Sequence, residues 1–127
     1  MLTHDPERYA DELWWRERRP ELVMGPGSWR WVERAYASSR ALFVPGLMER
    51  LAVPTLMVAT TADRLVKFGA VARACARLPR CELVRFGPEA RHEILRETDP
   101  VRARAMAAIA DFLDRAAPPP ATPPGTP

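Results

Sequence analysis

Two ionisable residues, Asp63 and His92, stand where an enzyme could place its chemistry. Each follows a short stretch with the composition of a strand, residues 55–59 and 81–86 respectively. A histidine that acts as a general base needs a partner on its second ring nitrogen. A carboxylate there selects the tautomer and stabilises the imidazolium that forms. The order aspartate then histidine, one helix and one strand apart, therefore predicts an acid–base pair.

The elements that would position this pair follow one another as strand, helix, strand and helix. Residues 55–59 (TLMVA) are apolar without polar alternation, which is typical of a strand buried on both faces. The unit is completed by a helix over about 67–78, a strand over 81–86 and a final helix. Asp99 caps the start of that final helix, with Pro100 directly after the cap. Adjacent parallel strands bring the loops at their carboxyl ends side by side. Two strands alone do not make a stable sheet, so we expect a piece of a larger sheet.

The first half of the chain predicts helices instead. Asp5 and Pro6 form a starting signal for a helix over 5–18, and Ser28 caps a second helix to about Leu42. The last residues are mostly proline, alanine and threonine, a composition typical of disorder. We therefore predict a helical portion over 1–52, a strand–helix–strand–helix core over 53–116, and a disordered Pro-rich tail over 117–127.

Simpler interpretations of the pair are open at this point. An aspartate in a loop is most often a turn-former or a helix cap, and Asp63 precedes the predicted helix over 67–78. A single histidine such as His92 is more often a surface residue than a catalyst. Spacing alone therefore favours a structural role, and a catalytic role needs support from further motifs.

Three segments resemble the α/β-hydrolase superfamily. Residues 54–66 (PTLMVATTADRLV) are similar to its strand-and-acid segment, PxLxxxGxxDxxV. Residues 87–97 (GPEARHEILRE) are similar to its histidine segment, GxxHExxxE, with a longer loop between the glycine and the histidine. Residues 2–9 (LTHDPERY) resemble the LTSDPERY stretch that opens the last cap helices of bacterial members. The departures are a threonine in place of the glycine and His4 in place of the serine. The resemblance covers about residues 2–115 and is closest to the lysophospholipase and monoacylglycerol-lipase-like branch of serine hydrolases.

This resemblance implies a fold and a reaction. The fold is the C-terminal part of an α/β-hydrolase: two parallel strands with flanking helices, preceded by helices of the cap. The reaction is hydrolysis of a carboxylic ester, such as a lysophospholipid or a monoacylglycerol, in which Asp63 orients His92 and His92 activates a serine. In this architecture Trp29 and Trp31 are candidate substrate-binding residues, although packing is the commoner role of a tryptophan. No metal and no organic cofactor is implied.

The chain itself carries no nucleophile of the kind that the family uses. A nucleophile elbow needs glycine two residues before and two residues after the serine, and Ser28, Ser38 and Ser39 all lack these glycines. The family order is serine, acid, histidine, so we expect the serine and the missing N-terminal half of the fold upstream. The chain is also compatible with the haloalkane dehalogenase and epoxide hydrolase classes, which use an aspartate at the elbow, and this alternative stays open. So does a non-catalytic truncated remnant that acts as an interaction module.

Composition bears on the remaining classes of function. The net charge is +3, but the arginines are scattered through every segment, so we expect no nucleic-acid partner. No apolar stretch is long enough for a membrane span and no signal-peptide pattern opens the chain, so we expect no stable membrane insertion and a cytoplasmic location. Cys75 and Cys81 form no CxxC pair beside a histidine cluster, so we expect no zinc site and two reduced thiols in the core.

Overall fold

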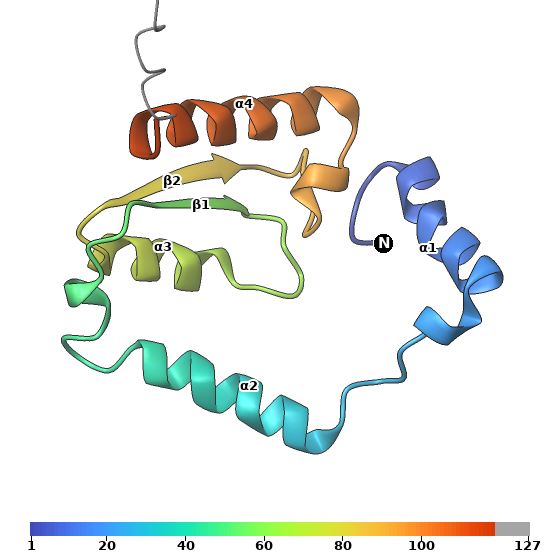
Figure 1. Ribbon diagram of the computed structural model, residues 1–127, viewed down its shortest axis with the longest axis horizontal. Coiled ribbons are helices and arrows are strands. Elements are labelled where there is room, and N and C mark those ends of the chain that lie inside the picture. The colour runs from blue at the N-terminus through green and yellow to red at the C-terminus, as the bar shows by residue number, and fades with distance from the viewer. Residues whose placement is uncertain (119–127) are drawn as a thin grey trace, which may run out of the picture.

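The computed structural model describes residues 1–118 and shows a mixed arrangement of helices and strands (Figure 1). The helices are α1 (Pro6–Arg18), α2 (Trp29–Leu42), α3 (Phe68–Arg77) and α4 (Asp99–Ala116), the strands are β1 (Thr55–Thr60) and β2 (Cys81–Phe86), and short 3₁₀ turns cover Pro20–Leu22, Met48–Arg50 and Ile94–Arg96. These bounds confirm the predicted order of elements. The predicted tail falls mainly on residues 119–127, which lie outside the described residues.

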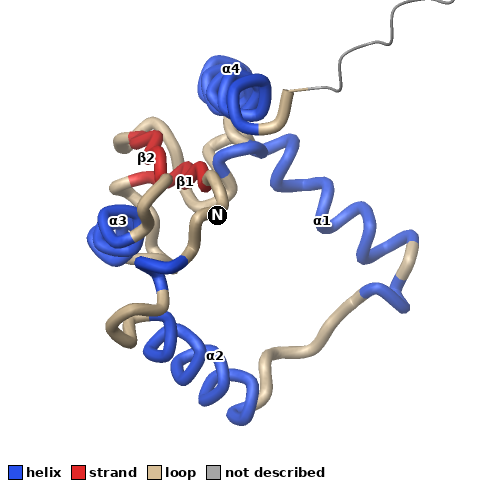
Figure 2. The backbone as a smooth tube through the Cα atoms, turned by 60° about the vertical axis from the view of Figure 1, so that its left-hand side comes forward, coloured by secondary structure: helices blue, strands red, loops and turns tan. Residues whose placement is uncertain are grey.

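Strands β1 and β2 form a two-stranded parallel sheet in which Thr55 pairs with Cys81 and Thr60 with Phe86. The chain passes from β1 through α3 to β2, the connection that parallel neighbours require. Helix α3 lies against one face of the sheet and α4 against the other (Figures 1 and 2). Both strands therefore end on the same side, where the loops that carry Asp63 and His92 begin.

The expected starting signals hold for the first two helices. The Asp5 carboxylate accepts hydrogen bonds from the amides of Glu7 (3.1 Å) and Arg8 (3.0 Å), and the Ser28 hydroxyl accepts one from the amide of Trp31 (3.2 Å). These bonds satisfy amides that have no partner within the helix.

The expectation that Asp99 caps α4 is wrong. The N-cap is Thr98, whose side chain makes no capping hydrogen bond, and Asp99 is the first helical residue. The helix begins one residue earlier than the capping pattern indicated, and Pro100 tolerates this because the second amide of a helix has no partner within the helix. The negative charge of Asp99 still suits the start of a helix, and its carboxylate pairs with the Arg8 guanidinium.

The core is small and sits between the sheet and α4. Phe86, Ala90, Ile94 and Ala105 are buried together, with Val58 and other partly buried apolar side chains packed against them. The expected burial of the apolar run 55–59 on both faces is not observed, because these side chains are only partly covered and Thr60 alone is buried in β1. The reason is that, among the described residues, β1 has a neighbouring strand on one side only.

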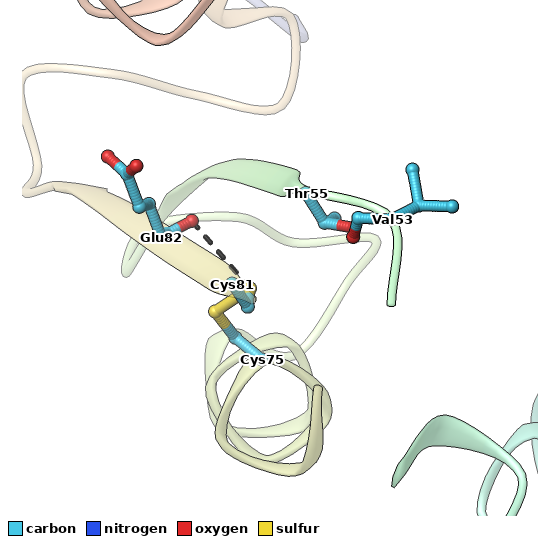
Figure 3. Close-up of a disulfide and its surroundings, with 5 residues drawn as sticks. All are labelled: Val53, Thr55, Cys75, Cys81 and Glu82. Carbon is cyan, nitrogen blue, oxygen red and sulfur yellow. Dashed lines mark hydrogen bonds between the residues drawn. A yellow bond between two sulfur atoms is a disulfide. The ribbon is translucent and has the colours of Figure 1, made fainter. Parts of the chain in front are cut away.

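The two cysteines form a disulfide, contrary to the expectation of reduced thiols (Figure 3). Helix α3 ends at Arg77 and the chain returns at once into β2, which places Cys75 and Cys81 with their Cα atoms 5.4 Å apart. This separation is typical of a disulfide. The expectation failed because it rested on motif spacing and presumed compartment, whereas the close approach comes from the tight connection between α3 and β2.

Helices α1 and α2 extend away from the sheet in both views (Figures 1 and 2). Neither helix buries a residue, although α2 carries Trp29 and Trp31. The connection after α2 is held to the core by Arg77, whose guanidinium pairs with Glu49 (2.7 Å) and donates to the carbonyls of Phe43 and Val44. That ion pair lowers the pKa of Glu49 to about 2.

Candidate functional site

Asp63 lies in the turn that follows β1 and uses its two carboxylate oxygens differently. Oδ1 accepts hydrogen bonds from the amides of Leu65 (2.8 Å) and Val66 (3.0 Å). This is the local turn-forming role expected of a loop aspartate. It fixes the side chain and leaves Oδ2 free to meet a second group.

That second group is His92, from the loop after β2. Its Nδ1 lies 2.8 Å from Asp63 Oδ2, so the predicted contact between the two side chains is present. A carboxylate can only accept here, so the hydrogen-bond network assigns the proton to Nδ1 and the lone pair of the neutral ring to Nε2. Asp63 is 12% exposed and His92 36% exposed, so the acid is sheltered while the ring reaches the surface.

The environment keeps Asp63 ionised. Partial burial raises the pKa of Asp63, but the hydrogen bond from His92 and those from the amides of Val66 and Leu65 outweigh it. The net effect holds the pKa below its ordinary value. A carboxylate that stays charged while its partner ring gains a proton is what a general base requires of its orienting residue.

A buried threonine ties the two site loops together. The Thr60 hydroxyl lies 2.8 Å from the carbonyl oxygen of Gly87 and 2.9 Å from that of Ala90, and it accepts from the amide of Ala62 (3.0 Å). Its single proton is therefore shared between two acceptors in the histidine loop. This contact spans 30 residues of sequence and fixes the separation between the aspartate turn and the histidine loop.

Glu97 is a second organising residue, and the sequence interpretation assigned it no role. Its side chain is fully buried. It accepts from the amide of His4 (3.1 and 3.0 Å to its two oxygens), from the amide of Arg91 (2.8 Å) and from the His4 ring at Nδ1 (3.0 Å). Because Arg91 directly precedes His92, Glu97 fixes the backbone that carries the candidate base. The signal for this role in the sequence was the position of Glu97 as the last residue of the histidine motif.

The hydrogen bonds to Glu97 also decide its charge. Burial raises the pKa of Glu97, but the amides of His4 and Arg91 and the His4 ring outweigh burial and hold the pKa below its ordinary value. A backbone hydrogen bond also joins the start of the chain to the histidine loop, from the Glu93 amide to the Leu2 carbonyl (2.9 Å). The segment before α1 is therefore held against the histidine loop, far away in sequence.

His92 stands between two pockets of different character. One, of about 410 Å³, is mainly apolar and includes Val58, Ile94 and Ile109. The other, of about 370 Å³, includes His4, Arg64 and Arg91. No hydrogen-bond partner of His92 Nε2 is present among residues 1–118, so this nitrogen can meet a ligand or another part of a protein.

The other predicted site residues do not join this pair. Trp29 and Trp31 are 90% and 66% exposed on α2, and neither lines a pocket that contains His92. Their role in substrate binding stays a prediction. Ser28, Ser38 and Ser39 belong to the same helix and its cap, and they also line neither pocket.

Metal-binding clusters and membrane-spanning helices are both absent from the part of the chain that the structure describes. Residues 1–118 contain no group of three or more histidine, cysteine, aspartate or glutamate side chains that could hold a metal ion. No helix in this part of the chain combines the length and the apolar composition needed to cross a membrane.

Comparison with known proteins adds no relative from which a role could be transferred. No protein-family model matches the chain, and no curated protein and no solved structure matches it. The geometry of the Asp63–His92 pair and the sequence motifs around it are therefore the basis on which a function can be proposed.

Proposed function

We propose that the chain is the C-terminal part of a serine α/β-hydrolase, and that Asp63 and His92 are the acid and the base of its catalytic triad. The observation that supports this most directly is the 2.8 Å contact between Asp63 Oδ2 and His92 Nδ1, with Nε2 left open to a pocket. The pair has the order and the connection that an α/β-hydrolase uses. The motifs around both residues supply the second line of support.

In the proposed reaction His92 moves one proton twice. Its Nε2 takes the proton of a serine hydroxyl while the serine oxygen attacks the ester carbonyl, and the charge of Asp63 stabilises the imidazolium that forms. The imidazolium then gives the proton to the leaving alcohol, and water releases the acyl group in the same way. A lysophospholipid or a monoacylglycerol would suit the family branch that the motifs resemble.

The proposal requires a partner for this chain: the N-terminal half of the same fold, with the serine and the oxyanion-hole donors. Two features favour such a partner. Within residues 1–118 the sheet has two strands, fewer than a stable sheet normally needs. Large apolar side chains are also exposed outside the sheet, such as Met24 at 91% and Trp29 at 90%. Apolar exposure of this size is typical of a surface that another polypeptide covers.

Two alternatives use the same fold. A truncated remnant would keep the Asp63–His92 contact and act only as an interaction module, which the same exposed apolar surface would suit. An enzyme with an aspartate at the elbow, as in haloalkane dehalogenases and epoxide hydrolases, would keep the pair and change the nucleophile. The upstream sequence separates all three.

The decisive experiment reads the genomic sequence upstream of Met1 and expresses any in-frame segment together with this chain. We expect a Gly-x-Ser-x-Gly segment and hydrolysis of a p-nitrophenyl ester by the joined protein. His92→Ala and Asp63→Asn should each lower kcat at least about a hundredfold, because removing any triad member removes most of the catalysis.

The matched control is Asp111→Asn, on the exposed surface of α4, which should leave kcat unchanged. A stop codon upstream would favour the remnant, and an aspartate at the elbow would favour the dehalogenase or epoxide hydrolase class. Full activity in the Asp63→Asn variant of the joined protein would contradict the triad.

A further inference from the structure

The smaller pocket beside His92 has a basic lining. It is formed by residues from the start of the chain, from the aspartate turn and from the histidine loop, among them His4, Arg64, Arg91 and His92. No aspartate or glutamate is among the residues that line it. Its volume of about 370 Å³ falls within the range of sites for small-molecule ligands.

Arg91 is held rigidly at this pocket without an ion pair. Its Nε donates to His4 Nε2 (3.1 Å), and its Nη1 donates to the carbonyls of Met1 (3.4 Å) and Thr3 (3.3 Å). Since His4 Nε2 accepts this bond, His4 carries its proton on Nδ1, donates it to Glu97 and is neutral. Arg91 is therefore bonded only to neutral groups among the described residues, and its charge is not offset by direct contact with a carboxylate.

Arg64 brings to the same pocket a second guanidinium that makes no ion pair among the described residues. Its side chain is exposed, and within residues 1–118 it forms no side-chain ion pair or hydrogen bond. The carboxylates of Asp63 and Glu97 lie near the pocket and keep their charge, but their oxygens face other donors than the two arginines. Asp63 accepts from His92 and two amides, and Glu97 accepts from His4 and two amides.

We propose that this pocket binds an oxyanion, a phosphate or carboxylate group carried by the substrate, between Arg64 and Arg91. Guanidinium groups match the geometry of both oxyanions, and a guanidinium held in place loses little freedom when it binds one. The bound anion would lie beside His92, because His92 lines the same pocket. A small molecule that carries both the anion and the ester would therefore bring its ester bond close to His92. This inference rests on the proposed function for its link to a substrate, but the anion site itself can be tested separately.

The test titrates inorganic phosphate into the isotope-labelled 127-residue chain at constant ionic strength and follows the ring and backbone NMR signals of the pocket residues. We expect saturable shifts at His92 and Arg91. Arg64→Gln should weaken phosphate binding about tenfold, because it removes a charge-assisted hydrogen-bond donor. Acetate in place of phosphate shows which oxyanion the pocket prefers.

The matched control is Arg34→Gln, which removes another exposed positive charge, from α2, and should leave phosphate binding unchanged. Arg91→Lys is the second variant, because lysine keeps the charge but loses the planar fork, and it should bind phosphate more weakly than the unsubstituted chain. Absence of saturable shifts with either anion, or equal binding by the chain and by Arg64→Gln, would overturn the proposal. The same spectra report the His92 tautomer without phosphate, so failure of the anion site is distinguishable from failure of the Asp63–His92 pair.

Discussion

Asp63 serves the turn and the histidine at the same time. One carboxylate oxygen accepts hydrogen bonds from the amides of Leu65 and Val66, while the other faces His92. A turn-forming role and a role in orienting His92 are therefore compatible. The amide bonds hold the carboxylate in one orientation before any substrate arrives. Preorganisation of this kind lets a carboxylate orient and stabilise an imidazolium without rearranging.

The contact between the two residues can be measured through the acid. His92→Ala should raise the pKa of Asp63 toward its ordinary value, because one of the hydrogen bonds that stabilise the carboxylate is lost. The amides of Leu65 and Val66 still donate to Oδ1 in this variant and continue to oppose the effect of burial on the pKa of Asp63. The measurement is the carboxyl-carbon chemical shift of Asp63 as a function of pH.

The sign of the linked stability effect follows from the lowered pKa. The Asp63 carboxylate contributes stability that is fully present above its ordinary pKa and is lost as pH falls through its folded-state pKa. Its contribution should therefore disappear at acid pH in a series of unfolding measurements at different pH values.

For the pKa of Asp63, His4→Ala is the matched histidine control, because His4 contacts Glu97 and not Asp63. An identical Asp63 pKa in the chain and in His92→Ala would mean that the contact does not form in solution.

At the scale of elements, the site depends on how closely α3 returns the chain to the sheet. Thr60 at the end of β1 is hydrogen-bonded to the loop after β2, and Cys75 in α3 is bonded to Cys81 at the start of β2. One link lies at each end of the β2 strand. Together with the backbone pairing of β1 and β2, they hold α3 and the loop after β2 against the sheet.

The disulfide predicts a measurable loss of stability on reduction. A bond that closes a loop of this size contributes about 2 kcal/mol by limiting the unfolded chain. We therefore expect dithiothreitol to lower the urea midpoint of the oxidised chain. The variant with both Cys75→Ala and Cys81→Ala should show the lower midpoint with and without the reductant. Two thiols that react with iodoacetamide in the folded, unreduced chain would contradict the bond.

At the scale of the whole molecule, the chain has a candidate site but little core. Among residues 1–118, the fully buried apolar side chains belong to the sheet, the histidine loop and α4, and α1 and α2 add none. Helices without a buried face take little stability from packing. An N-terminal half that covers α1, α2 and the sheet edges would supply the missing burial.

Without that half, the chain should not react as a serine hydrolase. The Ser28 hydroxyl accepts a hydrogen bond from the Trp31 amide at the start of α2. Ser38 and Ser39 lie within α2, where the Ser39 hydroxyl donates to the Ala35 carbonyl. None of them lines a pocket with His92, so no base is available to activate them. We expect no labelling by a fluorophosphonate probe, measured by mass spectrometry, alongside a known serine hydrolase as positive control. A labelled serine anywhere in this chain would refute the claim.

The sequence by itself determined the order of the elements, most of their bounds, the caps of α1 and α2, and the approach of Asp63 to His92. These follow from local patterns, since helical and strand periodicities and capping residues act within a few positions, and parallel strands align their carboxyl ends. Only the tertiary structure decided the Cys75–Cys81 bond, the incomplete burial of β1 and the cluster around Glu97. The Glu97–His4 contact joins residues 93 positions apart, and a contact of that kind depends on the path of the whole chain.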